Sequence, residues 1–170
     1  MTDERTRTVV NVLTVICLLV TVGSAIHATT TSGTHEPETG LYLLTENERG
    51  ELAASGYPRT LPANGSTRTV FVGVRNHLPS TSEYVLRVQL QSVSYAGETL
   101  TVERRTDVAT QRLTVDADGR TTTPVALSAP PDTNPSRVVF LLYRGDPPAN
   151  ATTDSAYRHT HYWLNETGGQ

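Results

Sequence analysis

An alternation of apolar and polar residues, unbroken over residues 86–91 of the stretch SEYVLRVQLQSVSY (residues 82–95), most constrains what this chain can fold into. Successive side chains of a β-strand point to opposite faces, so a period of two separates the residues into two rows. One row is Tyr84, Leu86, Val88 and Leu90, and the other carries Arg87, Gln89 and Gln91. This pattern predicts a strand with one buried face and one solvated face.

Shorter patterns of the same kind recur after residue 40, and no segment there has the 3.6-residue period of an amphipathic helix. The segments are LYLLT, TRTVFVGVRNH, ETLTVERR, QRLTV, GRTTTPVALS, SRVVFLLYR and YRHTHYWLN. The Asp118-Gly119 step predicts a hairpin turn. About seven or eight closely spaced strands predict one all-β domain over residues 41–165, an antiparallel β-sandwich that is immunoglobulin-like in architecture.

An apolar segment, VVNVLTVICLLVTVGSAI, covers residues 9–26 without a charged side chain. Its length is about the minimum for a helix that spans a bilayer. Arg5 and Arg7 precede it, and no further arginine or lysine occurs before Arg49, which predicts that residues 1–8 are cytoplasmic and that the domain lies outside. We therefore expect a single-pass protein of the cell membrane. Secretion after cleavage of a signal peptide is the alternative.

The segment HATTTSGTHEPETG (residues 27–40) is small, polar and aperiodic, which predicts a threonine-rich stalk, and residues 166–170 form a short tail. Sequons for N-glycosylation begin at Asn64, Asn150 and Asn165, and they agree with export. The first two fall in loops rich in Pro, Gly and Asn, where a glycan would be solvated.

The composition excludes several classes of function. The net charge is −3, so no basic surface points to nucleic acid. The one cysteine, Cys17, lies in the apolar segment. A single cysteine can form neither an internal disulfide nor a cysteine zinc site. There is no G-x-S-x-G motif, and no pair of carboxylates stands out on the strands. We expect a protein that is not an enzyme and has no cofactor.

The closing segment AYRHTHYWLNET contains two histidines in a geometry that can bind zinc. His159 and His161 share a strand face with Trp163, and outside the stalk only His77 could add a third ligand. Because tryptophan on an inward face usually belongs to the core, we expect His161 to be partly buried and hydrogen-bonded to a backbone group. This interpretation assigns no metal to the pair.

Two further motifs have ordinary structural explanations. The acidic turn with Glu46, Asn47, Glu48 and Glu51 offers oxygen ligands but lacks the spacing of a known calcium loop. The tripeptide Arg144-Gly145-Asp146 matches an adhesion motif, yet the two prolines that follow it favour a turn after a strand.

Several stretches together resemble the extracytoplasmic domain of the archaeal domain-of-unknown-function 1616 membrane proteins, found mainly in haloarchaea. The resemblance covers roughly residues 40–165. The matching features are Tyr57-Pro58, the Val-Gly-Val-x-Asn-His strand from Val72 to His77, Leu142-Tyr143-Arg144, and the closing Tyr157, Arg158, His161 and Trp163, with His159 as an extra residue. The resemblance implies a cell-surface β-domain and brings no catalytic residue. Family members usually carry several membrane helices before this domain, whereas this chain has at most one.

The sequence thus predicts a membrane-anchored β-sandwich that is a structural or interaction module of the archaeal envelope, with other envelope proteins or surface glycans as partners. One alternative is an extracytoplasmic module that binds a solute or a metal through the histidine pair or the acidic turn. A second alternative is an exported hydrolase.

Overall fold

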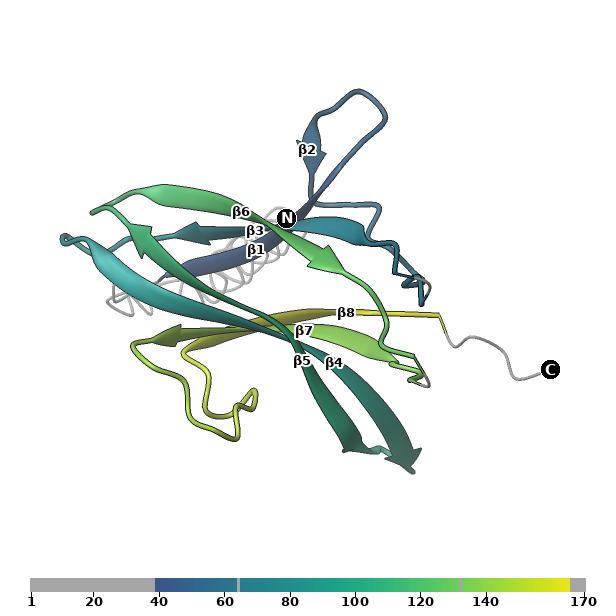
Figure 1. Ribbon diagram of the computed structural model, residues 1–170. Helices are drawn as coiled ribbons and strands as arrows, with labels where there is room; N and C mark the ends of the chain where they lie inside the picture. Colours follow the sequence, from purple (N-terminus) through teal and green to yellow (C-terminus); the bar gives the residue numbers. More distant parts are fainter. Residues whose placement is uncertain (1–38, 64, 132, 166–170) are drawn as a thin grey trace, which may run out of the picture. The chain divides into compact units, whose positions relative to one another are not determined.

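The computed structural model describes residues 39–63, 65–131 and 133–165. Within these residues the chain forms eight strands and no helix, as the sequence predicts (Figure 1). No helix among the described residues is long and apolar enough to cross a membrane, and the expected anchor, the stalk up to residue 38 and the tail lie outside them. The strands are β1 (Gly40–Glu46), β2 (Leu52–Ala53), β3 (Arg68–Arg75), β4 (Ser82–Ala96), β5 (Thr99–Val115), β6 (Arg120–Leu127), β7 (Arg137–Arg144) and β8 (Arg158–Trp163).

The strands form two antiparallel sheets, with the orders β2-β1-β3-β6 and β5-β4-β7-β8. The sheets lie one above the other in Figure 1, and the hairpin of β4 and β5 extends past the end of its own sheet. β1, β2, β3 and β6 belong to one sheet and β4, β5, β7 and β8 to the other, so the described residues form an all-β sandwich of two antiparallel sheets.

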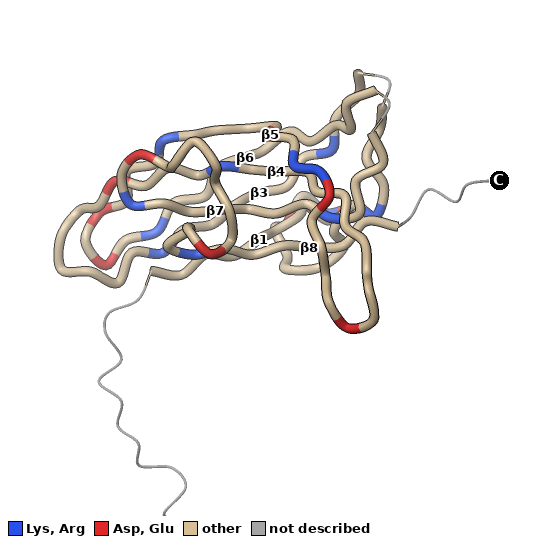
Figure 2. The backbone as a smooth tube through the Cα atoms, turned by 90° about the horizontal axis from the view of Figure 1, so that it is seen from below, with Lys and Arg blue, Asp and Glu red and all other residues tan. Residues whose placement is uncertain are grey.

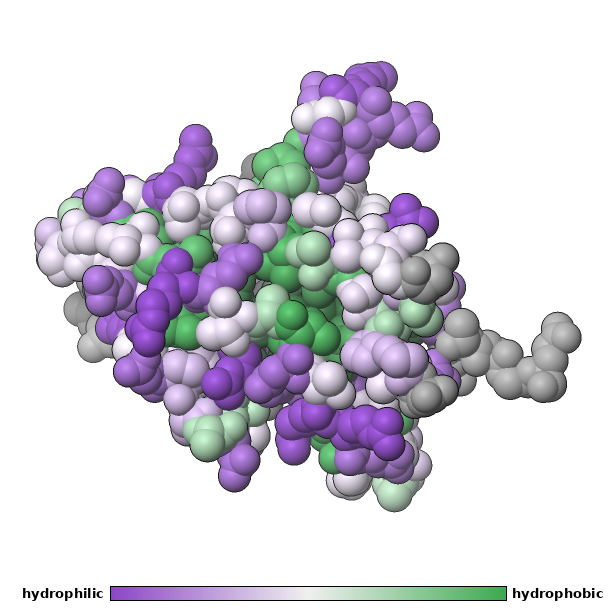
Figure 3. All heavy atoms as spheres, in the orientation of Figure 1, coloured by the Kyte–Doolittle hydropathy of each residue, from purple (hydrophilic) through white to green (hydrophobic). Residues whose placement is uncertain are grey.

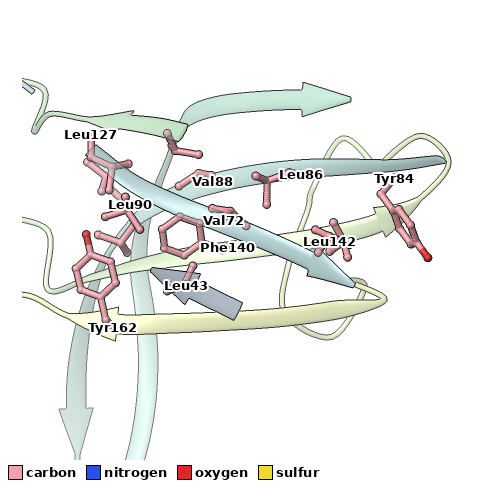
Figure 4. Packing of buried hydrophobic residues seen from close by; sticks show 14 of the residues in the cluster. Leu43, Val72, Tyr84, Leu86, Val88, Leu90, Leu127, Phe140, Leu142 and Tyr162 are labelled. Atoms are coloured by element: carbon pink, nitrogen blue, oxygen red, sulfur yellow. The ribbon is translucent and has the colours of Figure 1, made fainter. Parts of the chain in front are cut away.

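The core lies between the two sheets, and the predicted apolar row of β4 points into it together with a row from β3 (Figure 4). Burial of such side chains is the main favourable contribution to folding. The outer surfaces carry mostly polar residues, while apolar residues are visible between the sheets (Figure 3). Fully buried core residues include Val70, Val72 and Val74 of β3, Leu86 and Val88 of β4, and Phe140 and Leu142 of β7.

The second face of β4 is buried, which corrects the prediction of a solvated face. Gln89 and Gln91 are only 3% and 1% exposed. The reason lies in β7, whose sequence RVVFLLYR is apolar on both faces, as in strands covered on two sides. The segment of residues 145–157 that connects β7 to β8 contributes Ala151 to a second apolar cluster on this face, formed with Val85, Val139, Leu141 and Tyr143.

The predicted hairpin at Asp118-Gly119 is wrong, because the two strands that it connects, β5 and β6, belong to different sheets. The turn itself is present: Asp118 has a φ of 50°, and the amide of Gly119 donates to the Asp116 carbonyl. The backbone amide of Asn76, just after β3, donates to the Gly119 carbonyl and so brings the start of β6 beside β3. The two segments predicted before this turn, ETLTVERR and QRLTV, form the single irregular strand β5.

Asn76 is a buried polar centre at this end of the sandwich. Its side chain is fully buried; Nδ2 donates to the carbonyls of Ser80, Val115 and Asp116, and Oδ1 accepts from the Leu78 amide and the Tyr84 hydroxyl. Thr39 is also buried beside the Tyr84 hydroxyl, at 2.8 Å. The domain therefore begins slightly earlier than predicted, since Thr39 and Gly40 of the expected stalk belong to it.

We predict that Asn76→Ala lowers the free energy of unfolding by about 2–4 kcal/mol, because it leaves several buried carbonyls without a donor. Asn47→Ala is the matched control, since Asn47 makes a similar set of side-chain hydrogen bonds in an exposed turn. Its cost should stay below about 1 kcal/mol. Chemical unfolding of the full chain in detergent, followed by circular dichroism, measures both. Equal losses would contradict the role given to Asn76.

Candidate functional site

The histidine pair lies on the outer face of β8, which corrects the expectation of an inward face. His159 and His161 are both exposed, whereas Tyr162 enters the core. The register explains the orientation: Tyr162 pairs with the inward Val138, and His161 pairs with the outward Val139. Tyr162 of β8 and Leu164 directly after it lie on the opposite face from Trp163, and both enter the core. The burial of these two side chains outweighs the burial of Trp163 alone, and Trp163 remains partly exposed.

The structure does not bring the candidate ligands together. Among the described residues, no group of three or more histidine, cysteine, aspartate or glutamate side chains could hold a metal ion. His77 is exposed just after β3 and does not join the pair. In the acidic turn, the side-chain oxygen of Asn47 accepts from the amides of Arg49 and Glu51 and so stabilises the turn. That the pair binds no metal stays a prediction.

The adhesion-like tripeptide is engaged within the domain. The Arg144 guanidinium lies over the ring of Tyr157, with Cζ 4.0 Å from the ring centroid. Asp146 accepts a hydrogen bond from Arg112 at 2.6 Å in an exposed ion pair. Both charged side chains of the tripeptide therefore help hold the segment of residues 145–157 at the sheet.

Of the three sequons, the one at Asn64 lies on a residue outside the described ones, and its glycosylation stays a prediction. Asn150 and Asn165 are both exposed. Ala151, the middle residue of the second sequon, is buried, and the amide of Thr152 donates to the Ser155 hydroxyl. The Asn165 amide donates to the Arg59 carbonyl, which holds the end of the domain in place.

Four residues form a line across the outer face of the β5-β4-β7-β8 sheet, and we call them the outer row. They are Arg105, Gln91, Arg137 and Trp163, each opposite the next in the strand register. The guanidinium of Arg137 lies 5.5 Å from the Trp163 ring centroid. The His161 ring meets the Trp163 ring edge-on at 5.7 Å, and the ring of Tyr95, which is 61% exposed, is tilted 6.5 Å away.

A chain of hydrogen bonds beneath the surface fixes Gln91 and Arg137 of the outer row. Arg137 donates from Nε and Nη2 to the Gln91 Oε1, at 3.0 and 2.7 Å. Gln91 donates to the Gln89 Oε1, and Gln89 donates in turn to Asp107 and to the Ala151 carbonyl. Asp107 is also 3.7 Å from Arg87. Because the buried amides have partners, their burial is tolerated and the Arg137 side chain is held in one orientation.

A recess of about 380 Å³ adjoins the outer row at Arg105. It lies between β5 and the segment of residues 145–157, and its walls are mostly polar. Its lining residues are Gln89, Arg105, Asp107, Ala149, Asn150, Ala151 and Thr152. The volume is within the range of small-molecule sites, and Asn150 of the second sequon is one of the exposed residues that line it.

The electrostatics of the outer row favour a neutral His161 beside the Arg137 guanidinium. Partial desolvation beside Trp163 lowers the pKa of His161, and the nearby Arg137 and His159 lower it further. The outer row contains two arginines and no carboxylate, although acidic and basic residues are mixed over the sheet as a whole (Figure 2).

These features define a class: an all-β sandwich domain with an aromatic and arginine-lined surface on one sheet. The family described as Domain of unknown function (DUF1616) matches residues 33–165, and the chain belongs to this family. No curated protein matches the chain. Among solved structures, a β-glucosidase involved in saponin metabolism, from intestinal bacteria, matches with 10% identity and a TM-score of 0.40. The match covers 76% of this chain and 16% of that enzyme, and so weak a likeness does not bear on function.

We predict that His161 titrates below the ordinary histidine pKa of 6.5 in the folded protein. Because the unfolded chain binds this proton more tightly, the contribution of His161 to stability is present above pH 6.5 and is lost as the pH falls through the folded pKa. Arg137→Gln should raise the pKa of His161 by removing a neighbouring positive charge, whereas Arg112→Gln should leave it unchanged. An NMR titration of the imidazole signals measures these values. A midpoint above 6.5, or the same midpoint in Arg137→Gln, would contradict the assignment.

Proposed function

We propose that the chain is a membrane-anchored interaction module of the archaeal cell envelope and that the outer face of the β5-β4-β7-β8 sheet is its binding surface. The domain is not catalytic in this proposal. The observation that carries it is the outer row with its neighbour Tyr95: an exposed tyrosine ring and a partly exposed tryptophan ring lie beside the hydrogen-bonded Arg137 and the exposed Arg105.

The composition of this surface supports binding. Tyrosine, tryptophan and arginine are the side chains that most often dominate the energy of interfaces. Tyr95 is 61% exposed, and no core packing accounts for its position on the projecting β4–β5 hairpin. The rings of Tyr95 and Trp163 come from different hairpins, so the fold itself brings them together.

An external location is supported by two features. Arginines precede the apolar segment of residues 9–26 and are absent directly after it, which is the pattern of a helix with its N-terminus inside. The sequon asparagines Asn150 and Asn165 are exposed and hence accessible to a modifying enzyme. In this arrangement the threonine-rich stalk holds the binding surface away from the membrane.

The recess favours a second candidate, a solute-binding module. Its lining differs from the expected one, since neither histidine of the pair contributes to it. Hydrolysis has less support: Asp107 is the one carboxylate among the described lining residues, and it is engaged by Gln89 and Arg87. Glycosidic hydrolysis generally needs two carboxylates.

Crosslinking on intact cells tests the proposal. A photoreactive phenylalanine analogue in place of Tyr95 should form adducts with envelope components after illumination. The same analogue in place of Leu52 is the matched control, because Leu52 is the other large apolar side chain that is well exposed among the described residues, at 44%, and it lies in the opposite sheet.

We predict adducts from position 95 and at least about fivefold fewer from position 52, because binding energy concentrates in central aromatic positions. Arg105→Gln in the position-95 variant should reduce the yield. Equal yields at the two positions would contradict the binding surface, and adducts with cytoplasmic proteins would contradict the external location.

A further inference from the structure

We propose that the outer row and the recess bind an acidic polysaccharide whose sugar rings pack on Trp163 and Tyr95 and whose carboxylates pair with Arg137 and Arg105. The inference rests on the proposed function, because it names the ligand class of the same surface. Three independent features of the surface point to this ligand: its rings, its charges and its recess.

The aromatic rings suit a sugar. A pyranose ring presents C–H groups on one face, and these pack against the electron-rich face of an aromatic ring. The Tyr95 and Trp163 rings are inclined by 34° with centroids 6.5 Å apart, so they form an angled surface rather than a closed stack. Arg137 and His161 hold the Trp163 ring from two directions, which reduces the conformational entropy lost on binding.

The charges suit a carboxylate on that sugar. The ion pairs among the described residues are Arg87–Asp107 and Arg112–Asp146, and neither involves an arginine of the outer row. Arg137 is oriented by its two bonds to Gln91, while its Nη1 takes no part in them. Arginine binds carboxylates with shorter and stronger hydrogen bonds than neutral partners do, and a preoriented guanidinium increases that advantage.

The recess suits the hydroxyl groups of an adjoining sugar. Hydroxyls both donate and accept, and the walls offer the Asp107 carboxylate and the Arg105 guanidinium. Arg105 belongs to the recess and to the outer row, so one chain can extend from the first to the second. This continuity favours a polymer over a single small solute.

The experiment uses the full chain in detergent micelles and three probes, with binding followed by isothermal titration calorimetry. Oligogalacturonate carries rings and carboxylates, its methyl ester keeps the rings without the charge, and polyglutamate keeps the charge without the rings. We expect oligogalacturonate to bind at least about tenfold more tightly than either of the other two.

Variants connect the binding to the site. Tyr95→Ala and Arg105→Gln replace exposed side chains and should each weaken oligogalacturonate binding by about fivefold or more, whereas Leu52→Ala should leave it unchanged. Circular dichroism and the melting temperature confirm that each variant is folded.

Several results would overturn the inference. Equal binding of polyglutamate means simple charge attraction, equal binding of the methyl ester means that the arginines do not select carboxylates, and no effect of Tyr95→Ala places the site elsewhere. If oligogalacturonate does not bind while position 95 still crosslinks to an envelope protein, the polysaccharide is wrong and the interaction surface stands. If position 95 forms no adducts on cells either, both proposals fail.

Discussion

The structure depends on the need to bury β7 on both of its faces. One face packs into the core between the sheets, and the other forms a cluster with Val85 of β4. The segment of residues 145–157 satisfies this need by placing Ala151 on the outer face of the sheet. Covering that face also buries Gln89 of the neighbouring strand, whose side chain donates to the Ala151 carbonyl, and a buried amide without partners would cost on the order of 1–3 kcal/mol. The hydrogen-bond chain from Asp107 to Arg137 removes this cost.

The same chain of hydrogen bonds produces the candidate site. Gln91 uses its oxygen to hold Arg137, and Arg137 lies over Trp163, so a structural requirement of the sheet fixes the position of a surface aromatic. The cover ends before the outer row, where the β4–β5 hairpin brings up Tyr95 and the recess begins. A preorganised binding surface is expected to have side chains that are exposed to a ligand and held in place by hydrogen bonds beneath them.

The sequence predicts this fold better than it predicts the site. Alternation identified the inward row at Leu86, because Arg87, Gln89 and Gln91 form the opposite row. Alternation does not identify the inward face of a strand when both of its faces carry apolar or amphipathic residues. In β8, whether Trp163 or Tyr162 enters the core depends on the register with β7, and the local sequence does not determine that register. The burial of Gln89 depends on a segment far along the chain. The outer row is a long-range feature of the same kind, since its four residues come from four strands.

The most direct test of this account is the fluorescence of Trp163, the one tryptophan in the sequence. We predict emission at a wavelength typical of a partly hydrated indole, quenching by acrylamide in the native protein, and a further change in emission in Tyr95→Ala. A core tryptophan, as the sequence pattern alone favours, would emit at short wavelength, resist acrylamide until the protein unfolds and ignore the substitution. That second result would contradict the outer row and every function assigned to it.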